Sequence, residues 1–301
     1  MMIQNLTRPI SESWFISLDI FMMVCSILIV ILAALFLSII LLDTNCHTVP
    51  MMLVANSYLI IFFVGFLFFL LSLFMIENDF RQIAYEDSLC IARTYILNSL
   101  ATTMYYSYFL QALYRYFCVI YPTHLFYQSP KFQLTLICLK WILGFASPVP
   151  YVLTDELVYN VDNQVCQVRF RLSAEIIYAL FCNYTIPIVL TILIYCKLVR
   201  YVKEMAKRVA PINILTRAKN ELKMVQRIIL LIGLITIVFL PTVIFVLMSF
   251  FNLAPKYYYR IGAVFAEISL IFVIITLFII TDPLKTFVMK ITKQKLNIAE
   301  P

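Results

Sequence analysis

The fold is decided by the stretch VPMMLVANSYLIIFFVGFLFFLLSLFMI, residues 49–76, in which no residue is charged. About 20 apolar residues are enough for a helix to cross a bilayer, and this stretch is longer. A second run of the same kind covers residues 20–42. Of the 301 residues, 63% are hydrophobic and 13% are charged, whereas soluble domains hold about 45–50% and about 25%. The composition excludes a soluble enzyme and indicates a polytopic membrane protein.

Further apolar stretches bounded by charge raise the expected number of membrane spans to seven. None shows the alternation of an outer-membrane β-barrel, whose strands are about ten residues long. We therefore expect an all-α seven-transmembrane bundle that forms a single domain over residues 1–301. The predicted spans are about 18–42, 50–76, 88–121, 131–153, 173–202, 222–251 and 259–281.

The distribution of Lys and Arg predicts the orientation. With seven spans the two termini lie on opposite sides, and basic residues gather in cytoplasmic loops. The side that holds the C-terminus carries 16 of the 23 basic residues, namely Arg115, Lys131, Lys140, Lys197, Arg200, Lys203, Lys207, Arg208, Arg217, Lys219, Lys223, Arg227, Lys285, Lys290, Lys293 and Lys295. We therefore expect a plasma-membrane protein with an extracellular N-terminal tail, residues 1–17, and a cytoplasmic C-terminus.

Two further features fit this orientation. Asn5 begins an Asn-Leu-Thr sequon on the outer tail, which predicts glycosylation there. Residues 283–296 alternate bulky apolar and basic side chains, which predicts an eighth, amphipathic helix on the inner leaflet. The net charge of +7 is therefore a property of the cytoplasmic face, where it attracts anionic membrane lipids, and does not indicate a nucleic-acid partner.

Polar residues, prolines and tryptophans inside the spans are the next landmarks, because polar groups in a membrane are costly and mark functional sites. They are Cys90 and Arg115 with Tyr116 in the third span, Trp141 in the fourth, Pro187 and Tyr195 in the fifth, Phe239 and Pro241 in the sixth, and Asp282 and Pro283 after the seventh.

Together these landmarks resemble the rhodopsin-like (class A) family of G protein-coupled receptors over nearly the whole chain. In that family a cysteine opens the third span twenty-five residues before a signalling arginine, which is the spacing of Cys90 and Arg115. The resemblance implies a disulfide from Cys90 to Cys166 in the second outer loop. It also implies switch roles for Tyr116, Tyr195, Phe239, Pro241, Asp282 and Pro283. The short tails and divergent motifs are similar to those of invertebrate orphan or chemosensory members.

The chain departs from the family pattern at three places. Tyr114 stands where an acid usually precedes the arginine, and Thr286 replaces the terminal tyrosine of the seventh-span motif. The middle of the second span, residues 60–69, holds no acid, so the sodium site of the family is absent. These departures concern coupling and sodium regulation, not the fold.

A mechanism follows from Arg115, Glu221 and Pro241. Glu221 lies twenty residues before Pro241, about 30 Å along a helix, so it is expected at the inner end of the sixth span, within reach of Arg115. Pro241 removes a backbone hydrogen bond and predicts a hinge. The resemblance implies that this pair opens when the sixth span moves outward and activates a heterotrimeric G protein. The cleft so exposed would have basic walls from Lys197, Arg200, Lys219 and Lys223.

An extracellular ligand is expected between the outer halves of the third, fifth, sixth and seventh spans. The ligand-binding candidates by depth are Tyr95, Asn98, Thr102, Glu175, Tyr178, Phe239, Thr242, Glu267, Phe272 and Thr276. An acidic rim, formed by Glu86, Asp87, Asp155, Glu156 and Glu267, suits a basic peptide, whereas the aromatic interior suits a small apolar molecule. Leu97 stands where amine receptors carry an aspartate, and Thr276 stands where opsins carry the retinal lysine. An amine anchored in that way is disfavoured, covalent retinal is excluded, and no cofactor is expected.

Other classes of membrane protein fit less well. A transporter would show paired, broken helices around midplane polar residues, and a channel would show a polar filter. An enzyme would need clustered catalytic or metal-binding groups, but His47 and His124 lack metal spacing. We expect no enzyme activity and no metal site, and we keep a small-solute transporter or channel as the alternative.

Overall fold

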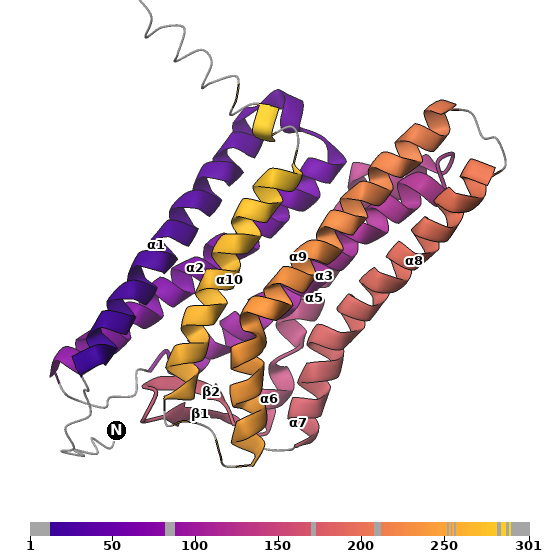
Figure 1. Cartoon of the computed structure of the whole chain (residues 1–301). Helices are drawn as coiled ribbons and strands as arrows, with labels where there is room; N and C mark the ends of the chain where they lie inside the picture. The colour runs from indigo at the N-terminus through magenta and orange to yellow at the C-terminus, as the bar shows by residue number, and fades with distance from the viewer. Residues whose placement is uncertain are drawn as a thin grey trace, which may run out of the picture.

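The computed structural model describes residues 13–81, 88–169, 173–207, 212–251, 253, 255, 257–281, 284–286 and 289. Long helices run side by side as a bundle, with a two-stranded hairpin at one end (Figure 1). The long helices are α1 Ser13–Leu42, α2 Val49–Arg81, α3 Cys90–Ile120, α5 Pro130–Ala146, α8 Ile186–Lys207, α9 Ile212–Phe250 and α10 Tyr258–Ile280. The short elements are η1 Thr44–Cys46, α4 Leu125–Gln128, α6 Val149–Leu153, strands β1 Leu157–Asn160 and β2 Val165–Val168, α7 Ala174–Tyr178, and the π-helix η2 Ala179–Thr185.

Hydropathy alone does not find all seven long helices. Within the described residues, five stretches of helix are long and apolar enough to cross a membrane, and α9 becomes a sixth when its two halves, bent by 50°, count as one span. The seventh long helix, α3, buries polar side chains such as Thr102, Ser107 and Gln111. Because α3 packs against α2, α5, α8 and α9, these groups face other helices rather than lipid.

Several helices extend beyond the apolar stretches that predicted them. Helix α9 begins at Ile212 rather than near residue 222, and α2 continues to Arg81 rather than ending near residue 76. Hydropathy marks the part of a helix that lies in lipid, whereas helical hydrogen bonds continue through polar residues outside it. Of the predicted eighth helix, residues 284–286 are helical, and apart from Met289 the remainder lies outside the described residues.

Two predicted spans are interrupted at prolines. The fourth is divided into α5 and α6 at Pro148, which has no amide hydrogen to donate. The fifth begins as α7 and the π-helix η2, which precede Pro187. The Thr185 hydroxyl donates to the Leu180 carbonyl at 2.8 Å within this irregular turn.

Close approach of α3 and α5 depends on a glycine. A Cβ atom at Gly144 would overlap the Thr103 Oγ1 atom, and one at Gly65 would lie 2.6 Å from Ile29, between α1 and α2. The central apolar core, which includes Tyr58 and Tyr108, joins α1, α2, α3, α9 and α10. The helices α2, α5, α8 and α9 pack around α3, which positions its inner and outer ends for the sites below.

Candidate functional site

We call the end of the bundle that holds the C-terminal ends of α3 and α8 and the start of α9 the inner end, because it is expected to face the cytoplasm. There, Arg115 of α3 pairs with Glu221 of α9. The Arg115 Nη1 atom donates to the Glu221 carboxylate at 2.9 Å, and the two side chains are 19% and 18% exposed. Among the described residues this is the ion pair that Arg115 makes. The guanidinium also lies 5.7 Å from the ring centre of Tyr114, the residue that replaces the usual acid. A ring thus faces the cation where a carboxylate normally would, and the carboxylate comes from α9.

A buried polar network lies directly above this pair and links α2, α3 and α5. Trp141 donates to the Asn56 side-chain oxygen at 2.9 Å, and Asn56 donates to Ser107. Gln111 donates to Ser57, which in turn hydrogen-bonds Ser107 at 2.7 Å. Ser57, Ser107 and Gln111 were not among the predicted site residues, although residues 107, 111 and 115 follow each other at a spacing of four and so share one face of α3.

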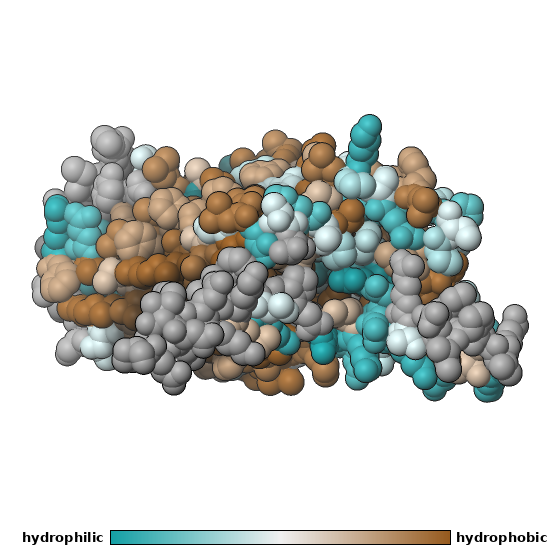
Figure 2. All heavy atoms as spheres, turned by 90° about the horizontal axis from the view of Figure 1, so that it is seen from above, coloured by the Kyte–Doolittle hydropathy of each residue, from teal (hydrophilic) through white to brown (hydrophobic). Residues whose placement is uncertain are grey.

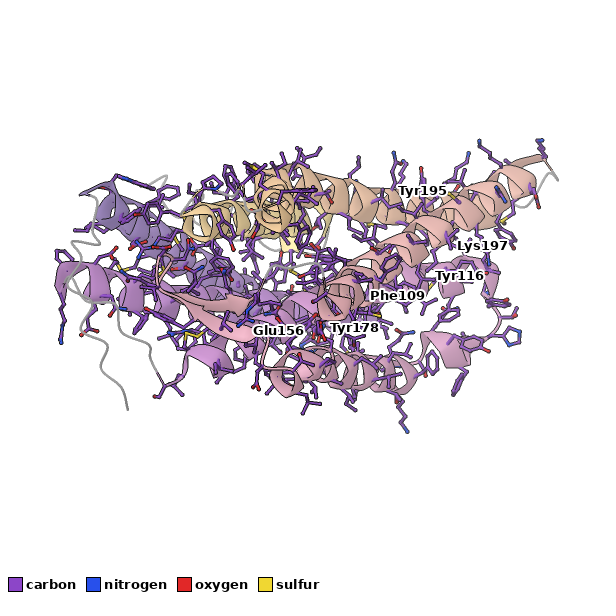
Figure 3. The ribbon with its side chains drawn as sticks, turned by 90° about the horizontal axis from the view of Figure 1, so that it is seen from below. Phe109, Tyr116, Glu156, Tyr178, Tyr195 and Lys197 are labelled. Carbon is purple, nitrogen blue, oxygen red and sulfur yellow. A yellow bond between two sulfur atoms is a disulfide. The ribbon has the colours of Figure 1, made fainter. Side chains whose placement is uncertain are left out.

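The other predicted switch residues of the inner half do not all meet at this pair. Tyr116 and Tyr195 pack beside an apolar cluster between α3, α8 and α9. Figure 3 shows both of them with Lys197 toward the inner end, whereas Glu156 and Tyr178 lie nearer the opposite end. Pro241 lies just beyond the 50° bend of α9, between the segments Ala218–Val238 and Leu240–Phe250.

The inner ends of α8 and α9 form a basic surface. Lys197, Arg200, Lys219 and Lys223 are all exposed there. Seen from above in Figure 2, hydrophilic side chains gather on the side where these helix ends lie. The inner ion pair is therefore flanked by exposed positive charge, with Glu221 as its acidic member.

At the outer end, the hairpin of β1 and β2 is tied into the bundle. The expected disulfide is present, between Cys90 at the start of α3 and Cys166 of β2. Thr94 donates to the Cys166 carbonyl at 2.7 Å, and Gln167 donates to the Tyr258 hydroxyl of α10 at 2.9 Å. All four residues of β2 are buried, so this hairpin packs as part of the bundle instead of standing in solvent.

A fully buried charge cluster, Arg260 with Asp19 and Asp79, lies against the same hairpin. Arg260 Nη1 donates to Asp79 at 2.7 Å and to Asp19 at 3.3 Å, and all three side chains are at most 1% exposed. Gln164 of the hairpin turn donates to Asp79 at 2.6 Å, and the Arg260 side chain donates to the Asn163 carbonyl. This outer charge cluster joins α1, α2 and α10. This cluster was not predicted from the sequence, because charges at the ends of spans were interpreted only as signals of membrane orientation.

The ligand candidates of α3 hydrogen-bond to the helix itself and to the neighbouring fourth span. Tyr95 donates to the Phe145 carbonyl and Asn98 to the Thr94 carbonyl. The Thr102 hydroxyl donates to the Asn98 carbonyl and accepts from Ser147. The polar groups of these three side chains are thus engaged within the bundle.

The candidates of α9 and α10 point in different directions. Thr242 donates to the Gly262 carbonyl at 3.3 Å, across the contact of these helices. Glu267 is fully buried and lies near the Cys25 thiol of α1. Phe272 is 42% exposed on the outer surface of the bundle. These three residues therefore do not converge on one pocket.

The remaining candidates lie nearer the surface. Glu175 and Thr276 are half-buried, and Tyr178 is 36% exposed. Of the acids expected at an open rim, Glu156 is 3% exposed because the hairpin that it precedes folds into the bundle end, and Glu267 is buried within the helices. The expected acidic rim is wrong at these two positions.

Some predicted residues lie outside the described part of the chain. They are Asn5, Glu86, Asp87, the side chain of Phe239, Asp282 and Pro283. Within the ranges that the structure does describe, no group of three or more His, Cys, Asp or Glu residues could hold a metal ion.

Comparison with known proteins shows which family has this architecture. No curated protein sequence matches the chain. The crystal structure of squid rhodopsin matches its fold with a TM-score of 0.78 and 14% sequence identity, over 97% of this chain and 89% of that one. At that identity the likeness shows the fold alone, a seven-helix membrane bundle. The pattern of the family described as "7 transmembrane receptor (rhodopsin family)" matches residues 33–284, and such receptors are typically not enzymes. The chain is a multi-pass membrane protein that belongs to the rhodopsin family of G protein-coupled receptors.

Proposed function

We propose that the chain senses an extracellular ligand at the plasma membrane and activates a heterotrimeric G protein by outward movement of the inner half of α9. The observation that carries this proposal is the ion pair between Arg115 and Glu221, at 2.9 Å. It is a contact between the helix that would move and the central helix that would not. Loss of this single ion pair would free the inner half of α9 to move away from α3.

The segment that would move is the part of α9 that precedes Pro241. Glu221 lies about 30 Å from that proline along the helix, and α9 is bent by 50° in between, next to Pro241. A proline bend lets one half of a helix move while the other stays packed. Since the pair is partly exposed, water can replace each partner when it opens, so its net contribution is about 1–2 kcal/mol, between exposed and buried pairs.

Opening would present the basic surface of α8 and α9 to the cytoplasm. Lys197, Arg200, Lys219 and Lys223 are exposed there and suit an acidic surface of a G protein subunit. The same residues would contact anionic lipid in the resting receptor. In this proposal the N-terminus lies outside the cell and the C-terminus in the cytoplasm, the orientation that the distribution of Lys and Arg favours.

On the outer side, the buried hairpin covers the end of the bundle where a ligand would arrive. The ligand we propose is an extracellular small molecule or peptide. It would bind near the candidates in the outer halves of α3, α7 and α9, namely Tyr95, Asn98, Thr102, Glu175, Tyr178 and Thr242. Its effect would be transmitted through α3 and α9 to the inner ion pair.

The test measures G protein recruitment without ligand in cells, for variants displayed equally at the surface. Glu221→Ala should raise recruitment, because a loss of about 1–2 kcal/mol shifts the ratio of closed to open receptor by a factor of about 5–30. Arg115→Ala should abolish it. Glu204→Ala is the matched control, since Glu204 is an exposed acid at the inner end of α8, and it should leave recruitment unchanged. Equal recruitment by all variants would contradict the proposal.

A further inference from the structure

The outer charge cluster holds more acidic than basic groups. Asp19 of α1 and Asp79 of α2 both accept a hydrogen bond from the Nη1 atom of Arg260, at 3.3 and 2.7 Å, and all three side chains are at most 1% exposed. Two carboxylates and one guanidinium leave one negative charge in excess, and a buried charge without a counter-ion is costly. In the fully ionised form the cluster would therefore carry an uncompensated buried charge.

No second cation reaches the cluster from the described part of the chain. The other titratable or charged groups in the outer parts of the elements that meet there are Cys25 on α1, Glu77 and Arg81 on α2, Glu156, Tyr159, Asp162 and Arg169 on the hairpin and its flanks, and Tyr257, Tyr258, Tyr259 and Glu267 at the start of α10 or within it. The two cations among them are exposed, and Arg81 pairs with Glu77 at 2.8 Å. The excess negative charge thus has no counter-ion among these groups.

The cluster also contains buried oxygen atoms that lack a donor. The Asp19 Oδ1 and Gln164 Oε1 atoms have no hydrogen-bond partner among the described residues. Gln164 is 1% exposed and its Nε2 atom donates to Asp79 at 2.6 Å, so its oxygen lies beside the same carboxyl group. The carboxyl groups of Asp19 and Asp79 also lie within hydrogen-bond reach of each other. Two carboxylates cannot bond to each other because each only accepts, whereas a protonated carboxyl group donates.

We propose that the outer charge cluster binds one proton, which Asp19 and Asp79 share, and that this proton holds the hairpin turn against α1 and α2. The proton brings the net charge of two carboxylates and one guanidinium to zero. It also supplies the hydrogen bond that the Asp19 oxygen lacks. A metal cation would need several oxygen ligands around it, and carboxyl groups already in hydrogen-bond reach of each other leave it no place.

The hairpin turn is tied to the cluster and is strained. Gln164 has a φ angle of 53°, in the left-handed region that residues with a side chain seldom adopt. Its hydrogen bond to Asp79, and the bond from the Arg260 Nε atom to the Asn163 carbonyl at 3.4 Å, hold the turn in place. Loss of the proton sets two like charges beside each other, which weakens these bonds and favours opening of the turn.

The place of the hairpin gives the proton a regulatory role. The hairpin lies beside the start of α10, at the end of the bundle where the ligand would arrive (Figure 1). Release of the proton would therefore change the access of a ligand to the bundle. This consequence rests on the proposed function, whereas proton binding and its effect on the hairpin do not.

Proton binding is tested by infrared difference spectroscopy on the purified full chain in phosphatidylcholine nanodiscs at neutral pH. Asp19→Asn keeps the shape of the side chain, and its amide can donate to Asp79 as the protonated acid does. The spectrum of wild type minus Asp19→Asn should show the carbonyl band of one protonated carboxylic acid, which shifts in heavy water. Subtraction removes any band from Glu267, which both proteins contain. Absence of the band from this difference would overturn the proposal.

Asp155→Asn is the matched control. Asp155 is an exposed acid just before the hairpin, with a φ angle of 51°, a backbone conformation that asparagine tolerates. Wild type minus Asp155→Asn should show no acid band. Unfolding temperatures near that of wild type confirm that both variants are folded. An equal acid band in both differences would show that the band does not report on the cluster, and would also overturn the proposal.

The effect on the hairpin is tested by amide hydrogen exchange of residues 157–168 at several pH values. If the closed hairpin holds one proton that the open hairpin releases, opening becomes tenfold more favourable with each unit of rising pH. Exchange in wild type relative to Asp19→Asn at the same pH should therefore rise about tenfold per unit between about pH 6 and about pH 8. Asp155→Asn should follow wild type. Comparison at one pH cancels the intrinsic pH dependence of exchange.

Two results of the exchange experiment would count against the inference. Equal exchange in wild type and Asp19→Asn at every pH would overturn the effect on the hairpin. Wild-type exchange that depends on sodium chloride, with choline chloride as the reference salt, and not on pH would assign the place to a metal cation and overturn the shared proton. None of these measurements involves a G protein, so a failure of the proposed function would leave their outcome unaffected.

Discussion

At the outer end of the bundle Arg260 pairs with two carboxylates out of contact with water, whereas at the inner end Arg115 pairs with one in partial contact with it. Removing one partner of a buried pair leaves an uncompensated charge in a poor solvent, while a partly exposed pair opens with water as the substitute. The outer charge cluster joins α1, α2, α10 and the hairpin, and the inner pair joins α3 and α9 alone. From this difference we expect the outer end of the bundle to resist rearrangement and the inner pair to open at a lower free-energy cost.

The largest effect should come from breaking the outer charge cluster. Arg260→Ala should lower the free energy of unfolding by about 3–5 kcal/mol, because it leaves Asp19 and Asp79 buried without their cation. Thermal unfolding in detergent micelles measures the loss. Arg169→Ala, at an exposed arginine that follows β2, is the control and should change stability by less than about 0.5 kcal/mol. Wild-type stability in Arg260→Ala would contradict the fixed outer end.

A smaller effect should separate the fixed helices from the moving one. Gly144→Ala should cost about 1–3 kcal/mol, since the new Cβ atom meets Thr103 and forces α3 and α5 apart. Gly233→Ala on α9 has nothing within 4 Å of its new Cβ atom and should stabilise the helix by about 0.5–1 kcal/mol. Unfolding midpoints of the two variants decide it. Equal losses would show that α9 is packed as tightly as α5.

The inner ion pair should matter more for signalling than for stability. Glu221→Gln keeps the side-chain shape and removes the charge, so the free energy of unfolding should change by about 1–2 kcal/mol or less. Ligand-free recruitment should rise in the same variant. If instead Glu221→Gln unfolds as easily as Arg260→Ala, the two ends do not differ in the way described.

The smallest effect concerns Cys46 in the turn between α1 and α2. Burial raises the pKa of the Cys46 thiol above its usual range, and the Asp43 carboxylate, 3.9 Å from the sulfur, raises it further. Because the thiolate is the reactive form, maleimide should label Cys46 slowly at neutral pH and faster as the pH rises. Asp43→Asn removes the negative charge, lowers the pKa and should speed labelling at neutral pH. An unchanged rate would contradict the role of Asp43.

The sequence predicts the seven-helix fold and the residues of the inner pair, because these depend on linear spacing, and the resemblance to the rhodopsin-like family adds the Cys90–Cys166 disulfide. Apolar length identifies membrane helices, and Glu221 reaches Arg115 because both lie near the inner ends of their spans. Spacing fails where a helix is apolar on all sides, as much of α10 is. Such a helix carries no signal of which face turns inward, so the directions of Glu267 and Phe272 could not be predicted.

Lys140 shows a limit of predicting membrane orientation from the number of Lys and Arg residues on each side. Lys140 was counted among the basic residues of the inner face. In the structure it is 5% exposed within α5, with its ammonium 6.0 Å from the ring centre of Trp141. A lysine within a span looks the same in sequence as one at its end when the boundary is uncertain. The inner side keeps its excess of basic residues without it.

The outer charge cluster has a consequence for how the chain is made. Asp19 and Arg260 are 241 residues apart, and Asp79 and Arg260 are 181 apart. During synthesis from the N-terminus, both aspartates therefore enter the membrane long before their cation exists. Until Arg260 is synthesised, the first two spans lack the hydrogen bonds that it donates to Asp19 and Asp79 in the folded molecule. A chain that fails to insert its last span would keep Asp19 and Asp79 without their cation Arg260. Two unpaired acids in the membrane would distinguish such a chain from the complete receptor.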